Sequence, residues 1–430
     1  MKRLAMLMTA ILLLVGILSA CGPSDKSTSS GSSNASSKNN DGKISEPKPD
    51  KLVVWEDKDK DNALKPAIKS FEEKYGIKIE YKTLPMADKM RERLRLDGPA
   101  GKGPDVFTVP HDQIGQLVVQ GLMRPLDVPS SVTDTFTDSS IQAQTYKGKL
   151  YGLPKAVETP IFIYNKKLMD KAPATFDELY QFSKAFTKGG KYGFLFLGDN
   201  YYFAHAYMSG FGGYVFKNNN GTLDIKDLGL NNDGAVQGAE WIAKWYKEGL
   251  FPKGIVGTNG GSTLDGLFTE GKVASKMDGP WSFEGMKKAG IDYGVAPLPK
   301  LPNGEYPKTF IGVKGWHVSA YSKSPQWATK LVEWLTNAEN SKIRFEKSGE
   351  IPPVKALLKD PIIADNEGAK AVFVQAERGE PMPNIPEMSQ VWEPMANALQ
   401  LIVTGKQGAK PALDNAVKTI ETNITQLNAK

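Results

Sequence analysis

The chain has 430 residues, with 54 Lys and Arg against 48 Asp and Glu, which gives a formal net charge of +6. Charges of both signs are interspersed, so no basic patch for nucleic acid is present and the lysines are interpreted as a solvated surface. A chain of this length exceeds one comfortable hydrophobic core, so two lobes are expected. The single cysteine excludes an intramolecular disulfide.

Residues 1–20 have the pattern of a secretory signal peptide. Two basic residues precede an apolar run from Leu4 to Leu18, which is too short for a membrane-spanning helix. Cys21 follows small residues, as in a bacterial lipobox, so we expect its thiol to be acylated (palmitate or a similar chain); plain secretion with an incidental cysteine is the alternative. Residues 21–50, lipidated cysteine included, are predicted to form a disordered tether. We therefore expect a protein anchored on the extracytoplasmic face of a cell membrane, in a Gram-positive bacterium.

From Lys51 on, strand-like runs alternate with amphipathic helical stretches. The strand–helix–strand–helix–strand order up to Gly121 predicts an α/β fold with a mostly parallel sheet and helices on both faces. Strands are predicted at 51–55, 77–82, 103–110, 161–164, 192–197, 272–277, 293–296 and 309–319. Helices are predicted at 64–75, at 114–120, between Thr175 and Gly189, at 233–248 and around 327–335.

Catalytic and metal-binding motifs are missing from the sequence. The three histidines are far apart and match no metal-ligand spacing. The stretch DKDKDN at 57–62 starts like a calcium loop, but Asn62 stands where Gly is needed and Ile68 where a bidentate Glu is needed. No phosphate loop or nucleophile elbow is complete. We therefore predict no catalytic residue, no metal and no cofactor.

Aromatic residues beside turn-forming residues are the most informative feature. Trp281 follows Gly-Pro, YYFAHAY at 201–207 follows GDN, and Trp392 lies within PNIPEMSQVWEPM at 383–395. A sugar ring has apolar C–H faces and hydroxyl edges, so a saccharide site needs flat aromatic platforms bordered by carboxylates and amides. Loops also carry binding function more often than cores do. The alternative is that each aromatic residue caps a small satellite core, as expected for the helically spaced Trp241, Trp245, Trp327 and Trp334.

Several of these stretches carry a family resemblance. The chain resembles the maltose/maltodextrin-binding family of ABC-importer solute-binding lipoproteins in the segments KLVVWEDKDK, GPDVFTVPHDQIG, MDGPW, YGVAPLP and above all MPNIPEMSQVW. The resemblance extends over essentially all of 51–430. It implies the type II periplasmic-binding-protein-like fold, in which two α/β lobes, each with a mostly parallel sheet flanked by helices, are joined by three crossings and close around a sugar.

The resemblance also implies lobe boundaries. The crossings are expected near Val157–Glu158, Ala296–Pro299 and Ala320–Pro325. The N-terminal lobe would then comprise 51–157 plus 296–322, and the C-terminal lobe 158–295 plus 323–430.

The family's ligand-binding positions fall on a defined set of residues here. The charged group after the first strand maps to Glu56, Asp57 and Lys58. The carboxylate of the His-Asp pair maps to Asp112, and the glutamate at the first crossing maps to Glu158. The three aromatic platforms map to Tyr202, Trp281 and Trp392. Four family positions depart: a tryptophan is Val109, two arginines are Gln113 and Ala396, and a glutamate is Asn200. These changes alter the edges of the groove, so longer maltodextrins or cyclodextrins are alternatives to maltose.

The function implied is capture and delivery, with no bond broken. A monomeric protein would bind a maltodextrin or malto-oligosaccharide between its lobes and pass it to the transmembrane subunits of an ABC permease, while the lipid at Cys21 holds it to the membrane. Three alternatives remain at this stage: a receptor for a different oligosaccharide, a glycoside hydrolase or transferase, and a surface adhesin.

Overall fold

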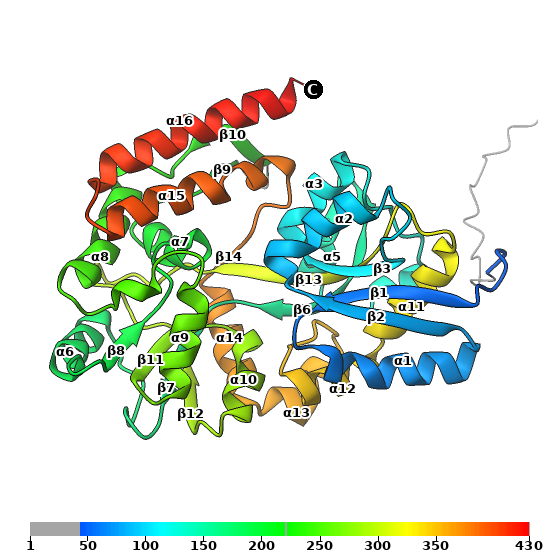
Figure 1. Ribbon diagram of the computed structural model, residues 1–430, viewed down its shortest axis with the longest axis horizontal. Helices are drawn as coiled ribbons and strands as arrows, with labels where there is room; N and C mark the ends of the chain where they lie inside the picture. Colours follow the sequence, from blue (N-terminus) through cyan, green and yellow to red (C-terminus); the bar gives the residue numbers. More distant parts are fainter. Residues whose placement is uncertain (1–43, 220–221, 430) are drawn as a thin grey trace, which may run out of the picture. The chain divides into compact units, whose positions relative to one another are not determined.

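The structure is a computed structural model that describes residues 44–219 and 222–429 (Figure 1). The predicted signal peptide, Cys21 and most of the predicted tether lie outside the described residues. The end of that tether is described, and there the prediction is wrong. The backbone N–H of Ser45 donates to Gln326 Oε1 at 2.7 Å, and Glu46 Oε1 accepts from the backbone N–H of Trp327 at 2.9 Å. These residues satisfy donors and acceptors at the start of a helix, so they belong to the folded body.

The first sheet has six strands. Its order is β14-β13-β3-β1-β2, with β6 beside β13. Apolar side chains of the central strands are almost fully buried, as expected for a sheet covered by helices on both faces. The strands are β1 (Lys51–Asp57), β2 (Lys78–Leu84), β3 (Val106–Pro110), β6 (Gly152–Glu158), β13 (Phe310–Val318) and β14 (Glu380–Pro381).

Three helices cover one side of this sheet. Helix α1 (Asp61–Tyr75) buries an apolar face and ends at Gly76, whose φ of 63° is the left-handed conformation that glycine adopts at low cost. Helices α11 (Pro325–Thr336) and α12 (Ala338–Ser348) pack on α1, and α11 also contacts β13 and β6. A third crossing near Ala320–Pro325 is therefore wrong, as is the assignment of these two helices to the C-terminal lobe. The reason is that the apolar face of α11 is buried against the first sheet.

The second sheet has four strands, in the order β12-β7-β11-β8. Strand β11 pairs parallel with β8, whereas β7 is antiparallel to both β11 and β12. The prediction of a mostly parallel sheet is wrong here. Strand β7 runs away from the first sheet, from which the chain has just come, whereas its neighbours β11 and β12 run towards the first sheet. The strands are β7 (Ile161–Asn165), β8 (Tyr192–Leu195), β11 (Val273–Asp278) and β12 (Tyr293–Ala296).

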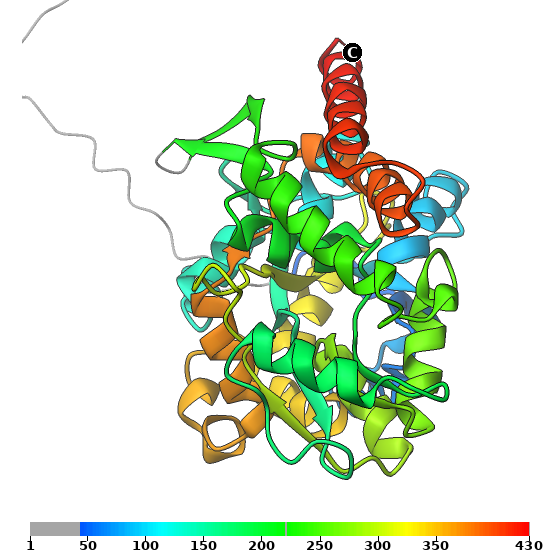
Figure 2. The ribbon, with the colours of Figure 1, turned by 90° about the vertical axis from the view of Figure 1, so that its left-hand side faces the viewer.

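Helix α6 packs on β8 of the second sheet, and four further helices pack on one another beside it, with α16 outermost (Figure 2). In α6, the Thr175 side chain caps the first turn by accepting from the backbone N–H of Glu178 at 3.2 Å. The aromatic run 201–207, which follows turn-forming residues in the sequence, lies within a helix. The cause is the Asn200 side chain, which accepts from the backbone N–H of Tyr202 at 3.0 Å and starts the helix. The helices are α6 (Phe176–Phe186), α7 (Tyr201–Gly210), α8 (Asp233–Lys247), α15 (Trp392–Val403) and α16 (Ala409–Asn428).

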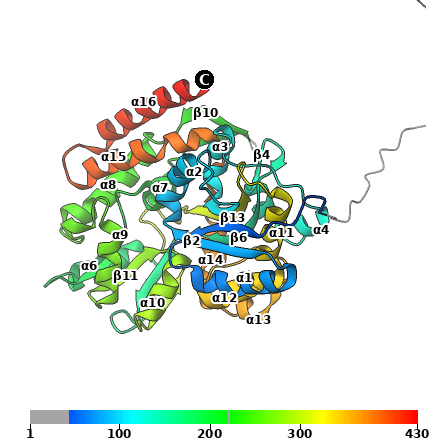
Figure 3. The same cartoon turned by 45° about the vertical axis from the view of Figure 1, so that its right-hand side comes forward.

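The chain passes between the sheets through adjacent segments (Figure 3). It leaves the first sheet at Glu158 and enters the second at Ile161. It returns from β12 to β13, and the two connections meet where Thr159 Oγ1 donates to the backbone oxygen of Phe310 at 2.9 Å. Helix α14 (Glu367–Glu377) then contacts β12 and β7 of the second sheet. The end of β6 and the start of β13 thus occupy the junction between the sheets.

The remaining elements are short or peripheral. Among residues 44–219 and 222–429, no helix is both long and apolar enough to cross a membrane. The elements are η1 (Met86–Met90), α2 (Arg91–Asp97), η2 (His111–Gln113), α3 (Ile114–Val119), α4 (Ser130–Thr133), α5 (Asp138–Ala143), β4 (Thr145–Tyr146), β5 (Lys149–Leu150), β9 (Phe216–Asn219), β10 (Thr222–Leu228), η3 (Lys253–Ile255), α9 (Gly260–Thr269), η4 (Pro280–Ser282), α10 (Phe283–Lys288), η5 (Leu357–Lys359), α13 (Pro361–Ala364) and η6 (Pro386–Gln390).

Candidate ligand-binding site

An aromatic cluster forms at the junction between the two sheets, around Phe310 at the start of β13. The ring of Tyr202 lies 6.2 Å from that of Phe310 in a stacked orientation, and the ring of Trp392 lies 5.8 Å away, edge-on. His205 stacks on Phe310 at 3.6 Å. Phe310 itself is fully buried, whereas Tyr202 and Trp392 are only partly buried. Two of the three predicted platforms therefore rest on one buried ring that sequence analysis missed.

Trp281 extends this cluster from the second sheet. It follows β11 in the short helix η4, and its ring lies 6.0 Å from that of Tyr202. Gly279 is required here, because a Cβ at this position would lie 2.1 Å from the Trp281 ring. The Gly-Pro turn therefore folds the indole back over its own backbone. Tyr202, Trp281 and Trp392 therefore lie in one cluster around Phe310.

The proline-rich segment before Trp392 is held from the first sheet's side. The Asn384 side chain donates to the backbone oxygens of Ala143 and Thr145, at 3.2 and 2.8 Å. Pro386 packs so closely on Gly115 that a Cβ there would lie 2.8 Å from its ring. Because Pro386 also begins η6, the chain enters α15 in one fixed direction. Trp392 is the first residue of that helix, so its ring is held by a rigid support.

Several buried polar atoms within the described residues have no hydrogen-bond partner. They include Asp112 Oδ1, Gln113 Oε1 and the hydroxyl of Tyr202, which belongs to the aromatic cluster. Burial raises the pKa of Asp112 to about 7, although its own backbone, Arg91 and the Trp392 indole oppose the rise. Leaving such groups unpaired costs about 1–3 kcal/mol each, so they mark places where a ligand can supply the missing hydrogen bonds.

Glu158 ends β6 and faces the same region. Its carboxylate is 2.6 Å from Lys314 Nζ. Burial raises the pKa of Glu158, and the positive charge of Lys314 opposes that rise. Burial also raises the pKa of the Tyr202 hydroxyl, with further contributions from the negative charges of Glu158 and Asp112. The negative charges of Glu158 and Asp112 therefore both act on the hydroxyl of Tyr202.

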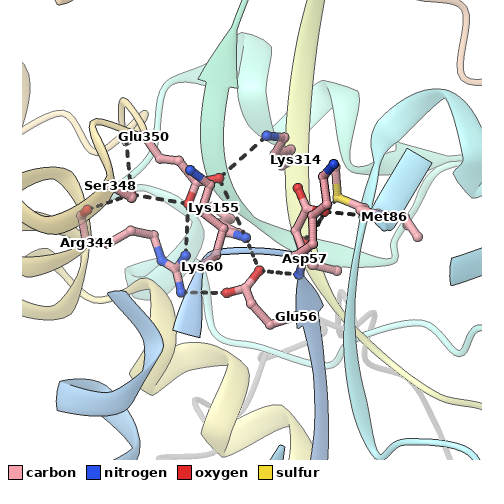
Figure 4. A network of polar contacts seen from close by, with 12 residues as sticks. Glu56, Asp57, Lys60, Met86, Lys155, Lys314, Arg344, Ser348 and Glu350 are labelled. Carbon is pink, nitrogen blue, oxygen red and sulfur yellow. Dashed lines mark hydrogen bonds and ion pairs between the residues drawn. The ribbon is translucent and has the colours of Figure 1, made fainter. Parts of the chain in front are cut away.

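Glu56 has a structural role instead of the predicted ligand contact (Figure 4). It is 0% exposed, and its Oε1 pairs with Lys155 while accepting from the backbone N–H of Asp57 at 2.8 Å. Its Oε2 pairs with Arg344 at 2.9 Å. Arg344 also pairs with Glu350 at 2.9 Å. Both Glu56 oxygens are thus used inside the protein, so we assign Glu56 to a buried ion network with Lys155, Arg344 and Glu350.

The other charged residues after β1 divide in a way that sequence could not resolve. Asp57 is partly buried, and its Oδ1 accepts from the backbone N–H groups of Lys58 and Met86. Lys58 is exposed. Asp59 has a φ of 61°, and this turn sends Lys60 inward to lie 3.8 Å from Glu284 on α10. Lys60, rather than Lys58, is therefore the buried cation of this stretch.

Lys314 is the other charged residue that sequence reasoning missed. It is 1% exposed and lies within β13, the strand that sequence analysis placed at 309–319. Lysine is almost never fully buried without a partner, so a lysine inside a predicted buried strand was the available signal.

The site and fold together define a binding protein of a known class. The family model for bacterial extracellular solute-binding proteins matches residues 66–371. The chain belongs to this family. Solved relatives are two-lobed solute-binding proteins of periplasmic-binding-protein type, and the two sheets described above correspond to the two lobes.

Particular relatives cover nearly the whole chain. The galactooligosaccharide-binding protein of Bacillus subtilis (strain 168) is 47% identical over 95% of this chain and 94% of its own length. The maltodextrin-binding protein MdxE of the same organism is 38% identical, over 84% of this chain and 87% of its own. A cyclo/maltodextrin-binding protein complexed with maltotetraose has a TM-score of 0.74 at 47% identity, covering 88% of this chain and 98% of that one. MalX from Streptococcus pneumoniae, in complex with maltopentaose, has a TM-score of 0.81 at 33% identity, covering 86% and 100%.

Proposed function

We propose that this protein captures maltodextrins, including linear malto-oligosaccharides and cyclodextrins, between its two lobes. The observation that carries the proposal is the set of unpaired buried atoms, Asp112 Oδ1 and the Tyr202 hydroxyl, beside the rings of Trp281 and Trp392. The rings would stack on the apolar faces of successive sugars. The polar atoms would accept from or donate to hydroxyls at the sugar edges, as Asp57 and Glu158 would also do. Relatives whose names or bound ligands are maltodextrins support this choice.

We further propose that the protein delivers its ligand to an ABC importer without changing it. A streptococcal relative, 34% identical over 99% of this chain, carries the name maltooligosaccharide ABC transporter solute-binding lipoprotein. In that arrangement the acylated Cys21 anchors a monomer to the cell membrane of a Gram-positive bacterium, and the permease receives the sugar. Ligand binding favours the closed arrangement of the lobes only by the difference in affinity between closed and open forms.

A second candidate ligand is a galactooligosaccharide. It is favoured by the name of the Bacillus subtilis relative that is 47% identical to this chain. Galactose also has an apolar face, since its axial O4 leaves one side of the ring to C–H groups, so the same aromatic cluster suits it. The two ligands differ in the hydroxyl that the edge residues must recognise.

Titration calorimetry separates these candidates. The chain from residue 22 onward, which retains every described residue, is titrated with maltotetraose, maltoheptaose, β-cyclodextrin, β-1,4-galactotetraose and, as a control, cellotetraose. We expect the tightest binding for the maltodextrins. Tighter binding of galactotetraose would replace maltodextrin by the second candidate. No binding of any of the five sugars at millimolar concentration would refute the oligosaccharide proposal.

The same samples test the absence of chemistry. Maltoheptaose is incubated with the protein and analysed for shorter products. We expect the sugar to be recovered intact. Shorter products that disappear in a Glu158→Gln variant would identify a hydrolase or transferase.

A further inference from the structure

Lys314 connects the ligand site to the buried ion network. Its Nζ lies 2.6 Å from Glu158 Oε2 and 3.5 Å from Glu350 Oε1, and it sits 6.0 Å from the centre of the Trp281 ring (Figure 4). The ammonium group is 1% exposed, so these groups, rather than water, compensate its charge. Lys314 therefore pairs with a carboxylate from the first sheet and lies near an aromatic platform from the second.

No other cation of the network has this position. Lys155 pairs with Glu56 and Glu350, and Arg344 pairs with the same two carboxylates. Both cations also lie over the ring of Trp316, which is fully buried in the first sheet. Of these three cations, only Lys314 contacts Glu158 and lies near the Trp281 ring among the described residues. Lys155 is consequently a matched comparison: an equally buried lysine of the same network that does not face the site.

We propose that Lys314 is a positioning residue for oligosaccharide binding, which holds the Glu158 carboxylate in place and charged and steadies the ring of Trp281. This inference rests on the proposed function. Glu158 could accept hydrogen bonds from sugar hydroxyls in one fixed orientation, because one of its oxygens is occupied by Lys314. The face of Trp281 turned to Lys314 gains a cation–π contact, which favours one ring position.

The charges around Glu158 explain why this lysine matters. Lys314 is the only cation that forms an ion pair with Glu158 among the described residues, while Glu350, Asp57 and Asp112 surround it with negative charge. Burial raises the pKa of Glu158 and Lys314 lowers it. Glu158 and Glu350 in turn raise the pKa of Lys314, so the ammonium stays charged over the working range. Removing Lys314 leaves burial and three carboxylates unopposed, so Glu158 takes up a proton at higher pH.

The proposal is tested by measuring the affinity of Lys314→Met for maltotetraose by calorimetry between pH 5 and pH 9. If the sugar panel shows that galactotetraose binds more tightly, galactotetraose is used instead of maltotetraose. At neutral pH we expect binding at least about tenfold weaker than in the unmodified protein, which corresponds to about 1.4 kcal/mol, because a charged hydrogen bond that orients Glu158 is lost. The pH at which affinity falls by half should also move upward. An unchanged affinity and an unchanged pH profile would overturn the proposal.

Two further variants separate positioning from folding. Lys155→Met should lower stability but leave the pH profile of binding unchanged; a profile that shifts as much as that of Lys314→Met would show a general effect of the network and overturn the assignment. In a Glu158→Gln background, Lys314→Met should weaken binding much less than it does in the unmodified protein, because the group it positions is already neutral. Fully additive losses would contradict the coupling between the two residues.

Lys314→Arg covers the case in which Lys314→Met does not fold. Arginine keeps the charge but has a larger, planar head group, so it cannot hold Glu158 in the same place. We expect weaker binding with an unshifted pH profile, and unchanged affinity would overturn the proposal. Failure of the proposed function looks different: the unmodified protein would then bind no sugar of the panel, whereas failure of this inference requires a protein that binds.

Discussion

Two neighbouring regions of this protein bury charged and polar groups, and they differ in whether those groups have partners. In the ion network, both oxygens of Glu56 are paired, and Arg344 bridges Glu56 and Glu350. The Glu350 oxygen without a hydrogen bond still lies 3.7 Å from Lys155 and 3.5 Å from Lys314. In the aromatic site, Asp112 Oδ1 and the Tyr202 hydroxyl have no hydrogen-bond partner.

The difference separates structural residues from recognition residues. A buried group whose bonding capacity is used inside the protein stabilises one arrangement of the chain, and a sugar could reach it only by breaking those contacts. A buried group with unused capacity destabilises the free protein, and a ligand that pairs with it recovers that free energy. Substitutions in the network should therefore change stability, and substitutions in the site should change affinity.

The largest effect is expected when the network loses one cation. Arg344→Met leaves Glu56 and Glu350 buried with less compensating charge, so the free energy of unfolding should fall by about 3–5 kcal/mol. Urea denaturation followed by circular dichroism measures it. Maltotetraose affinity at a temperature where the variant is folded should stay within about twofold, since Arg344 touches no residue of the site.

An exposed ion pair is the control for this experiment. Lys65 and Asp61 pair at 2.6 Å on the surface of α1. Lys65→Met should leave the free energy of unfolding nearly unchanged, because water already screens the charges. If Arg344→Met is no more destabilising than Lys65→Met, the network does not stabilise the fold as argued.

Loss of an aromatic platform should have the next largest effect, and this effect should be on sugar affinity and not on the free energy of unfolding. Trp392→Ala should weaken maltotetraose binding by about 1–3 kcal/mol, roughly five- to 150-fold, if the ring stacks on a sugar. Trp334→Ala is the matched control: this partly buried indole donates to the backbone oxygen of Ala67 at 3.1 Å, far along the chain from the site. It should lower stability and leave affinity unchanged. Equal affinity in Trp392→Ala and the unmodified protein would show that Trp392 packs in the core and does not stack on the sugar.

The smallest effect is expected from the titration of Asp112. Its pKa in the folded protein is raised from 3.8 to about 7, so its contribution to stability is full below about pH 4 and is lost as the pH rises towards 7. Asp112→Asn should not show this loss. Sugar hydroxyls favour the ionised carboxylate, so affinity in the unmodified protein should be about tenfold lower at pH 6 than at pH 8, following the ionised fraction. Calorimetry at pH 6 and pH 8 checks this prediction. If Asp112→Asn shows the same ratio of affinities between the two pH values as the unmodified protein, another group causes the pH dependence.

Local patterns were enough to predict much of the fold. The apolar face of α1 and its stop at Gly76, the Thr175 cap of α6 and the run of β13 all appear where short-range chemistry places them. The third crossing was wrong because α11 has an apolar face that either sheet could have covered. The apolar pattern of β7 also could not predict that this strand runs antiparallel to its neighbours, since its direction depends on which sheet the chain has just left.

The sequence by itself determined which residues could recognise a sugar: aromatic rings beside glycine and proline, and carboxylates at strand ends. Only the tertiary structure decided which of them are available. Glu56 and Asp112 are both acidic residues at or just beyond the end of a strand, yet Glu56 is paired with Arg344, 288 residues further along the chain, while Asp112 keeps an unpaired oxygen. Whether a buried charge is compensated depends on partners that only folding brings within a few ångström, and local sequence contains no record of them.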